Sequence, residues 1–358
     1  MRRSYMKRFI GIALAAILVV GILAGCGEKK TETTTPPATT EEKTEEKTEE
    51  KTAEAAAPEY EWKLGLNTSP GDIIYESMEV FKKTIEEASG GRIAVDIYAG
   101  GVLGDWRDCI EGLAYGMCDV FMESLGTLDA WSEYANIDAV PYLYSGYDHF
   151  MKVWSSDLGE EIREKVGEDG GFKLLGSMYR GVRITTAKYK MEKLADFKGF
   201  KLRAPNIQVY LETWKRIGAT PTPLAITETF TAIQQGTVDG QENPLLESYN
   251  YGFYDVCKYV IRTDHVYSQS IFMMDRDYYD SLPADIQGFV QEAAQAASDY
   301  KNAGTLKAEE ELVEKFKAKG CEIVEVDKQE FIDLFDGFVD EIFPNLSDWA
   351  NQIKAMDV

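Results

Sequence analysis

Between residues 60 and 240 the sequence alternates short strand-like runs with amphipathic helical segments, and this alternation most constrains the fold. Strand-like composition or spacing occurs at 60–66, 92–98, 119–122, 172–178, 200–203 and 238–240. Helical spacing of apolar residues occurs at 72–88, 106–115, 207–217 and 227–234. Because strands that alternate with helices form layered structures, the pattern predicts α/β layers with largely parallel sheets.

The length of the chain favours two lobes. Its 358 residues exceed the roughly 100–150 residues of a common domain, so one hydrophobic core is not expected to serve the whole body. Residues 283–319 have no proline after the first position and few other helix breakers, which predicts one long helix that spans both lobes. A second helical segment is expected from about residue 329.

Composition and charge narrow the function. Hydrophobic residues make up 44% of the chain and charged residues 28%, which is typical of a globular protein and excludes a wholly disordered or multi-span membrane protein. The formal net charge is −23, and so acidic a chain repels phosphate backbones, so that we expect no nucleic-acid partner. His149 and His265 are the two histidines of the chain, and no cofactor or metal site is expected.

The first 25 residues have the pattern of an export signal. Basic residues cluster within positions 1–8, and residues 9–25 are uncharged and apolar, which is short of the roughly 20 residues that span a bilayer. The stretch ends Leu-Ala-Gly before Cys26, which resembles the bacterial lipobox. We therefore expect a lipoprotein signal peptide at 1–25, lipid on Cys26 and attachment to the outer face of the cell membrane. The alternatives are an uncleaved anchor helix and an ordinary signal peptide.

Residues 26–57 form a biased tract of Thr, Glu, Lys, Pro and Ala that contains the near-repeat EEKTEEKTEEKT. Such a tract cannot bury a core, so a disordered tether is expected after the lipidated cysteine. The other cysteines show neither a CxxC pair nor zinc-like spacing. They could form disulfides or remain buried free thiols; they are Cys109, Cys118, Cys257 and Cys321.

Polar residues at the predicted strand ends mark a candidate ligand site. Ligands of open α/β sheets lie beyond the carboxyl ends of the strands. The guanidinium of arginine suits a carboxylate, because its planar fork donates two parallel charge-assisted hydrogen bonds. Each arginine could instead form an ordinary ion pair. The residues concerned are Asn67, Glu123, Arg203 and Asn243, with Arg180 and Arg183 after a further strand.

Three segments carry a specific resemblance to a known family. They are DFKGFKLRAPN at 196–206, GATPTP at 218–223 and QQGTVDGQENP at 234–244. Shorter agreements occur at 91–93, 103–104, 141–142 and 253–256. Together they span nearly all of residues 60–320 and resemble the extracytoplasmic solute receptors of tripartite ATP-independent periplasmic (TRAP) transporters.

The resemblance implies a bilobal fold of the periplasmic-binding-protein kind, in which two α/β lobes are joined by hinge strands and a long helix. Residues 58–180 with 269–308 would form lobe I, and residues 181–268 with 309–358 lobe II. A receptor of this kind closes over a small carboxylate solute and delivers it to the membrane subunits of the transporter. It is not an enzyme, and the sequence also lacks the GxSxG, GxxxxGK[ST] and HExxH motifs.

The resemblance also assigns roles to individual residues. Arg203 matches the arginine that clamps the solute carboxylate, Arg183 matches a second arginine that assists, and Asn243 matches an asparagine that faces the ligand. Asn67, Glu123 and Asn206 fall where the rest of the solute is contacted. His265 matches a polar position that acts through water, and a structural role is the alternative. Arg180 could serve a second carboxylate or pair with a local acid.

Two positions depart from members of the family that bind sialic acid. Gly126 stands where those members have an additional arginine, and Ile226 stands where they have an aromatic ring. Glu123 would repel a second carboxylate, which favours a hydroxylated monoacid such as a sugar acid. The alternatives are a C4-dicarboxylate or keto-acid receptor, a receptor for an ATP-driven importer, and a sensory receptor.

Overall fold

The computed structural model describes residues 57–357. The predicted signal peptide, Cys26 and nearly all of the predicted tether lie outside these residues. Within the described range, no helix combines the length and the apolar character that crossing a membrane would require.

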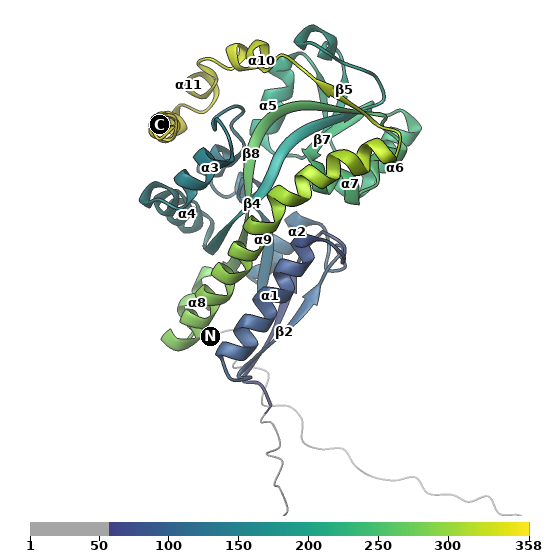
Figure 1. Ribbon diagram of the computed structural model, residues 1–358. Helices are drawn as coiled ribbons and strands as arrows, with labels where there is room; N and C mark the ends of the chain where they lie inside the picture. The colour runs from purple at the N-terminus through teal and green to yellow at the C-terminus, as the bar shows by residue number, and fades with distance from the viewer. Residues whose placement is uncertain (1–56, 358) are drawn as a thin grey trace, which may run out of the picture. The chain divides into compact units, whose positions relative to one another are not determined.

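Nine strands form one mixed sheet in the described part of the chain (Figure 1). Their order is β2-β1-β3-β8-β4-β7-β5-β6, and β9 pairs with β8 outside this path. The strands are β1 (Tyr60–Gly65), β2 (Ile93–Tyr98), β3 (Val120–Ser124), β4 (Phe172–Ala187), β5 (Lys201–Ala204), β6 (Thr220–Pro223), β7 (Gly240–Pro244), β8 (Tyr259–Asp275) and β9 (Glu322–Glu325).

The α-helices surround this sheet, and the predicted long helix is confirmed as α9. The predicted C-terminal segment divides into three short helices, α10 to α12. The helices are α1 (Ile73–Ala88), α2 (Trp106–Leu113), α3 (Tyr147–Trp154), α4 (Asp157–Gly170), α5 (Gln208–Ile217), α6 (Ile226–Gln235), α7 (Leu245–Asn250), α8 (Arg276–Asp280), α9 (Ala284–Ala318), α10 (Lys328–Leu334), α11 (Phe338–Ile342) and α12 (Ser347–Ala355).

The sheet is less parallel than the sequence predicted. Strand β8 pairs antiparallel with both β3 and β4, and β4 also pairs antiparallel with β7. The sequence pattern ended the fourth strand at residue 178 and missed β8 altogether. Both strands are long and largely buried along their length, and charged residues such as Arg183 and Asp264 interrupt their apolar runs.

Strands β4 and β8 connect the two halves of the sheet. The first part of β4 pairs with the last part of β8 next to β3, whereas the last part of β4 pairs with the first part of β8 and with β7. Their register shifts between residues 175 and 185 of β4. The predicted bilobal α/β class with hinge strands and a long helix is thereby confirmed; the exact lobe limits remain a prediction.

Helix α9 supplies hydrogen bonds where the β4 ladder is irregular. The amide of Tyr179 donates to Asn302 Oδ1 at 2.6 Å, and Asn302 Nδ2 donates to the carbonyl of Ser177 at 3.0 Å. The amide of Val182 donates to Glu309 Oε1 at 3.0 Å. These side chains satisfy backbone groups that the bulges leave without ladder partners, so the long helix fixes the crossing of β4.

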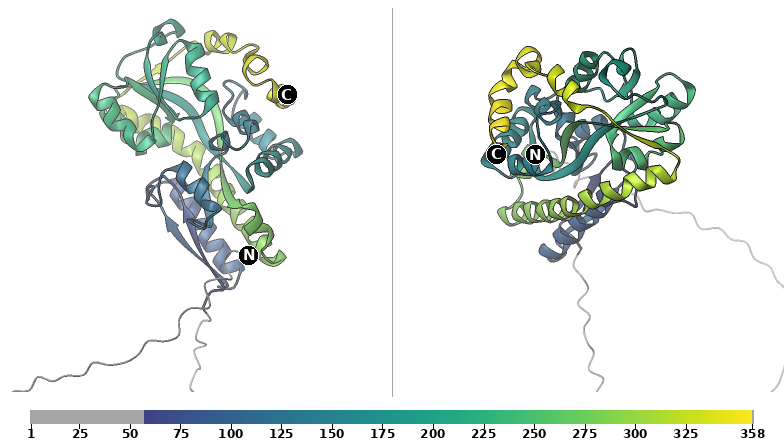
Figure 2. Two further views of the ribbon diagram at one scale, coloured as in Figure 1. Left: turned by 180° about the vertical axis from the view of Figure 1, so that it is seen from behind. Right: turned by 45° about the horizontal axis from the view of Figure 1, so that its top comes forward.

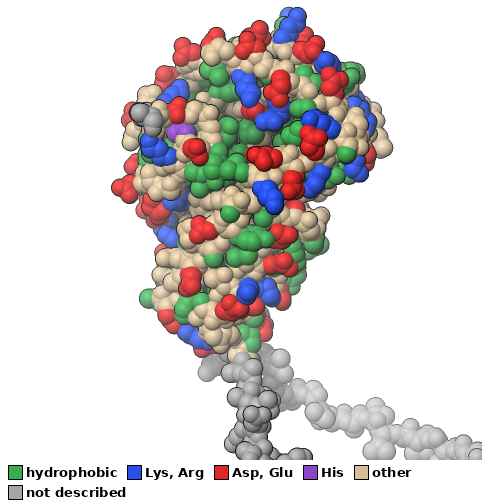
Figure 3. All heavy atoms as spheres, in the orientation of Figure 1, with side chains coloured by type: hydrophobic (Ala, Val, Ile, Leu, Met, Phe, Trp, Pro, Cys, Tyr) green, Lys and Arg blue, Asp and Glu red, His purple; other side chains and the backbone are tan. Residues whose placement is uncertain are grey.

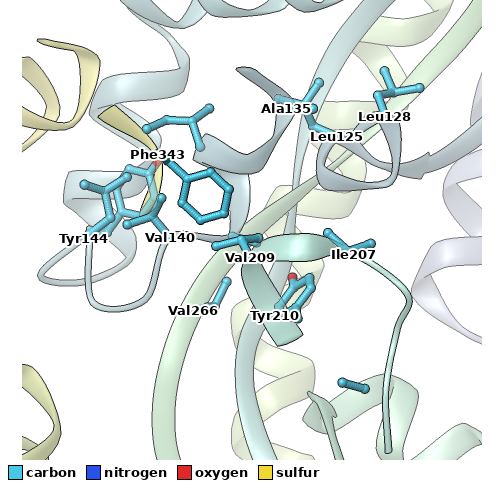
Figure 4. Close-up of a cluster of buried hydrophobic side chains, with 14 of the residues drawn as sticks. Leu125, Leu128, Ala135, Val140, Tyr144, Ile207, Val209, Tyr210, Val266 and Phe343 are labelled. Atoms are coloured by element: carbon cyan, nitrogen blue, oxygen red, sulfur yellow. The ribbon is translucent and has the colours of Figure 1, made fainter. Parts of the chain in front are cut away.

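A large hydrophobic cluster joins α5 to the 3₁₀ turns that follow β3. Ile207, Val209 and Tyr210 lie beside Leu125 and its neighbours in this cluster (Figure 4). The same region is tied by capping bonds, because the amide of Gln208 donates to Asp129 at 3.0 Å and the amide of Val209 donates to Asn136 at 3.2 Å. The free amides of the first turn of α5 are thus satisfied by a segment far away in sequence.

The C-terminal helix α12 lies against α3 and α4 (rear view in Figure 2), whereas α10 packs on α5. His149 Nε2 lies 2.8 Å from the carbonyl oxygen of Ile353, and Trp349 Nε1 donates to Glu161 at 2.9 Å. His149 therefore joins α3 to α12. The four cysteines of the described part are buried free thiols, which is one of the two arrangements left open by the sequence.

We predict that Glu309 makes folding stability depend on pH. Burial raises the pKa of Glu309 to about 7, although the hydrogen bond from Val182 opposes the shift. Because a raised pKa in the folded state penalises the ionised form, stability should fall as the pH rises from about 4.5 to above 7. Glu309→Gln should abolish this penalty and gain about 2–3 kcal/mol relative to the wild type across that window.

The measurement is denaturant unfolding at several pH values. Glu310→Gln is the matched control, because Glu310 is exposed on the same helix. Parallel pH profiles for the wild type and Glu309→Gln would show that the Glu309 carboxyl does not contribute.

Candidate functional site

A small cavity lies where the strand ends of the two sheet halves meet. The cavity is small and is lined by side chains from both halves, which suits a small solute rather than a polymer. Most of the predicted site residues line this cavity: Asn67, Glu123, Arg180, Arg183, Arg203 and Asn243.

The other two predicted residues do not line the cavity. Asn206 is exposed, and its neighbour Pro205 forms the wall instead. His265 is fully buried behind the wall and contacts Thr263, Glu242 and Trp214. The contacts of His265 are those of a structural histidine, the alternative that the sequence left open.

Arg203 lies on β5, between β6 and β7, and is only 3% exposed. Its Nε donates to the carbonyl of Leu224 at 2.9 Å. Among residues 57–357, no carboxylate forms an ion pair with Arg203, and no acceptor within hydrogen-bond distance faces its two terminal nitrogens. Burial lowers the pKa of Arg203 to about 10, so the side chain remains a cation at neutral pH. Its remaining donors are available to an anion.

Arg183, in contrast, has its own carboxylate. Arg183 Nε lies 2.6 Å from Glu242 Oε2, and a terminal nitrogen of Arg183 lies 2.7 Å from Glu242 Oε1. His265 Nε2 lies 3.2 Å from the same carboxylate. Burial alone would raise the pKa of Glu242, but the charge of Arg183 and these hydrogen bonds lower it to about 2. Arg183 is therefore neutralised by the protein.

The pairing of β4 with β7 places Asn243 beside Arg183. Ile184 is opposite Asn243 in the ladder, and Arg183 donates to Asn243 Oδ1 at 3.0 Å. Asn243 Nδ2 donates in turn to Gln241 Oε1 at 2.6 Å. These two bonds fix the orientation of the Asn243 amide, so one of its amide hydrogens remains for a ligand.

Arg180 bridges two carboxylates at another part of the cavity wall. Its Nε donates to Glu247 Oε1 at 2.9 Å, and a terminal nitrogen donates to Glu123 Oε1. Glu123 Oε1 also accepts from the amide of Ser124 at 2.8 Å. Arg180 therefore pairs with local acids, which is one of its two predicted roles.

The sequence pattern did not indicate Glu247 or the three aromatic residues that line the cavity. Glu247 lies in the first turn of α7, directly after β7, and its position after the strand end was the signal that could have found it. Trp106, Tyr210 and Tyr251 supply flat apolar surface, and the Tyr210 ring centre lies 4.6 Å from the guanidinium carbon of Arg183. Aromatic residues are common in cores, so sequence alone did not distinguish these three.

The positive charge of the site is local. Acidic and basic side chains of the described residues are interspersed over the face in Figure 3, and the chain as a whole carries a net charge of −23. An anion is therefore not attracted by the overall field of the protein but by the unpaired guanidinium inside the cavity. Such an arrangement can bind and orient an anionic solute.

Comparison with known proteins agrees with this chemistry. Residues 64–345 match the model of the family described as bacterial extracellular solute-binding protein, family 7. The sialic acid-binding periplasmic protein of Vibrio cholerae is 30% identical over 284 residues, which cover 79% of this chain and 88% of that protein. A solute-binding protein of Roseobacter denitrificans is 32% identical over 277 residues, covering 77% and 85% of the two chains.

Solved structures agree as well. The crystal structure of a TRAP periplasmic solute-binding protein from Roseobacter denitrificans with bound L-galactonate has a TM-score of 0.79 at 29% identity and covers 83% of this chain and 99% of that one. A receptor from Pseudomonas putida with bound D-glucuronate has a TM-score of 0.80 at 26% identity, covering 82% and 97%. The chain described here therefore belongs to family 7 of the bacterial extracellular solute-binding proteins, the solute receptors of TRAP transporters.

Proposed function

We propose that this protein is an extracytoplasmic receptor that binds a small sugar acid and delivers it to the membrane subunits of a TRAP transporter. The observation that carries the proposal is the buried guanidinium of Arg203, which lines the cavity without a carboxylate partner in the described part of the protein. A buried charge without a counter-ion is costly, and a solute carboxylate would remove that cost.

The remaining wall of the cavity supports a hydroxylated monoacid. Arg180 already contacts Glu123 and Glu247, so a second carboxylate at this place would meet two acids. Carboxylate and amide oxygens accept hydrogen bonds from hydroxyl groups. The Roseobacter and Pseudomonas receptors were solved with L-galactonate and D-glucuronate, which are acids of this kind.

A larger, nine-carbon sialic acid is less well supported. Ile226 lines the cavity at the position where the family resemblance implies an aromatic ring in sialic-acid receptors, and the resemblance implies an additional arginine of those receptors at the position of Gly126. The amide of Gly126 donates to Asp138 at 3.3 Å, so this segment is used for internal structure. The 30% identity to the Vibrio protein therefore supports the family but not that solute.

We further propose that capture depends on closure of the two lobes. The crossing of β4 and β8 would act as the hinge, and the capping of α5 by Asp129 and Asn136 would hold the lobes together over the solute. A solute favours closure only by the contacts that are stronger in the closed state. The proposed lipid on Cys26 and the tether would keep the receptor near its membrane partner and raise its effective concentration there.

Replacement of Arg203 should abolish tight binding. Arg203→Ala should weaken the binding of L-galactonate or D-glucuronate by about 2–4 kcal/mol, because the carboxylate loses its buried cation. The thermal stability of the empty protein should stay near that of the wild type or rise, since the change removes an uncompensated charge. Isothermal titration calorimetry and thermal unfolding measure the two quantities.

Lys201→Ala is the matched control for this prediction. Lys201 is an exposed cation on the same strand, two residues before Arg203, so its removal changes the net charge equally. Affinity that is as strong in Arg203→Ala as in Lys201→Ala would contradict the role of Arg203 as the clamp.

Replacement of Cys26 should release the protein from its lipid linkage. Cys26→Ser removes the thiol to which the diacylglycerol would be attached, so metabolic labelling with a radioactive fatty acid should disappear. Cys109→Ser is the control, because Cys109 is a buried thiol of the folded body. Lipid labelling that persists in Cys26→Ser would contradict the lipobox interpretation. Membrane attachment of the wild type without any lipid label would favour an uncleaved anchor.

A further inference from the structure

One carboxylate oxygen in the cavity wall is buried and has no partner in the described residues. Glu247 is 3% exposed, and its Oε1 accepts the hydrogen bond of Arg180. Its Oε2 is fully buried and no donor contacts it. Because an unsatisfied buried acceptor costs about 1–3 kcal/mol, an oxygen of this kind in a ligand cavity indicates that the ligand supplies the donor.

Asn67, two residues after the end of β1, presents a second acceptor of the same kind. Its Oδ1 is buried without a hydrogen-bond partner, and the side chain lines the same cavity as Glu247. Tyr251, also in the wall, links the two regions, because its hydroxyl donates to the backbone oxygen of Asn67 at 3.4 Å. The cavity thus contains two acceptors without partners among the described residues, one from the segment after β1 and one from α7.

The charges around Glu247 argue against an anion at this end of the cavity. Arg180 is shared between Glu247 and Glu123. Lys301 and Asp72 also lie within the electrostatic range of Glu247, and the Nζ of Lys301 donates to a backbone carbonyl. Three acids therefore face two cations, and a second solute carboxylate would become the fourth acid of this group.

We propose that Glu247 and Asn67 form an acceptor pair that determines specificity by binding two hydroxyl hydrogens in the tail of the solute. The pair selects acids with one carboxylate and a hydroxylated tail, and it rejects the corresponding diacids. This inference rests on the proposed function, because it presumes that Arg203 holds the single carboxylate. It adds Glu247 to the residues that would contact the tail of the solute, and it names the chemical difference that the pair would detect.

Two matched pairs of solutes test the proposal. Galactarate is L-galactonate with its terminal hydroxymethyl group replaced by a carboxylate, and D-glucarate is the diacid that corresponds to D-glucuronate. Calorimetry with the wild type should show, for whichever pair of solutes the protein binds, that the monoacid binds more tightly than its diacid. Glu247→Gln should weaken the binding of that monoacid at least tenfold and should reduce the preference over the diacid, because a glutamine amide can donate to a carboxylate.

Glu228→Gln is the control, because Glu228 is an exposed acid on α6, two residues after the cavity residue Ile226. Its monoacid-to-diacid ratio should equal that of the wild type. Asn67→Ala tests the second acceptor by an independent route and should also weaken monoacid binding. It covers the case in which Glu247→Gln fails to fold, which thermal unfolding would reveal.

The outcomes separate the inference from the function on which it rests. Suppose that the wild type binds a monoacid through Arg203. If Glu247→Gln then leaves the ratio of monoacid to diacid affinity unchanged, and Asn67→Ala leaves the monoacid affinity unchanged, the acceptor pair alone is overturned. An equal loss for both solutes in Glu247→Gln would also overturn it, since a merely structural role of Glu247 predicts that result. A wild type that binds none of these acids would overturn the proposed function and the inference together.

Discussion

The site depends on a buried arginine that the described part of the protein leaves without a counter-ion. Three arginines line the cavity, and two of them are neutralised by glutamates: Arg183 by Glu242, and Arg180 by Glu123 and Glu247. Arg203 alone among these three bonds only to a backbone carbonyl. Since desolvation of a charge is costly, the fold maintains an unfavourable state that an anion relieves on binding. This imbalance, and not the number of arginines, would give the cavity the proposed preference for one carboxylate.

The segment that connects the lobes is also a segment of the site. Arg180 and Arg183 lie on β4 within its irregular part, where Gly181 has a φ of 107° and α9 replaces the missing ladder bonds. A change in the backbone at this crossing would therefore move two cavity arginines relative to their partner glutamates, which lie on β3, β7 and α7. The long helix limits such changes, because Asn302 and Glu309 hold the backbone on either side of Arg180. Hinge geometry and cavity geometry are in this way coupled through a few residues.

The sequence was informative where local pattern and structure agree. The helix α9, with few breakers over many turns, was predicted nearly to its ends, and Arg203 and Asn243 were found because they lie near strand ends within distinctive motifs. The sequence was misleading where tertiary pairing overrides local pattern. Strand β8 has buried polar residues such as His265, whose ring nitrogens bond to Thr263 and Glu242 in the folded protein, and these residues interrupt its apolar pattern. Asn206 follows Arg203 closely in sequence but is turned out to solvent after Pro205.

The acidity of the protein and the anionic character of its proposed solute are compatible because they act over different distances. At physiological ionic strength the Debye length is about 8 Å, so surface acids are screened from a solute that approaches the cleft. Inside the cavity the dielectric is lower, and the contact between Arg203 and a carboxylate is correspondingly stronger. Affinity is then determined by groups within a few ångströms of the solute. By the same argument the proposed specificity of the site would come from its nearest acceptors, because at that distance Glu247 and Asn67 would distinguish a hydroxyl hydrogen from a second negative charge.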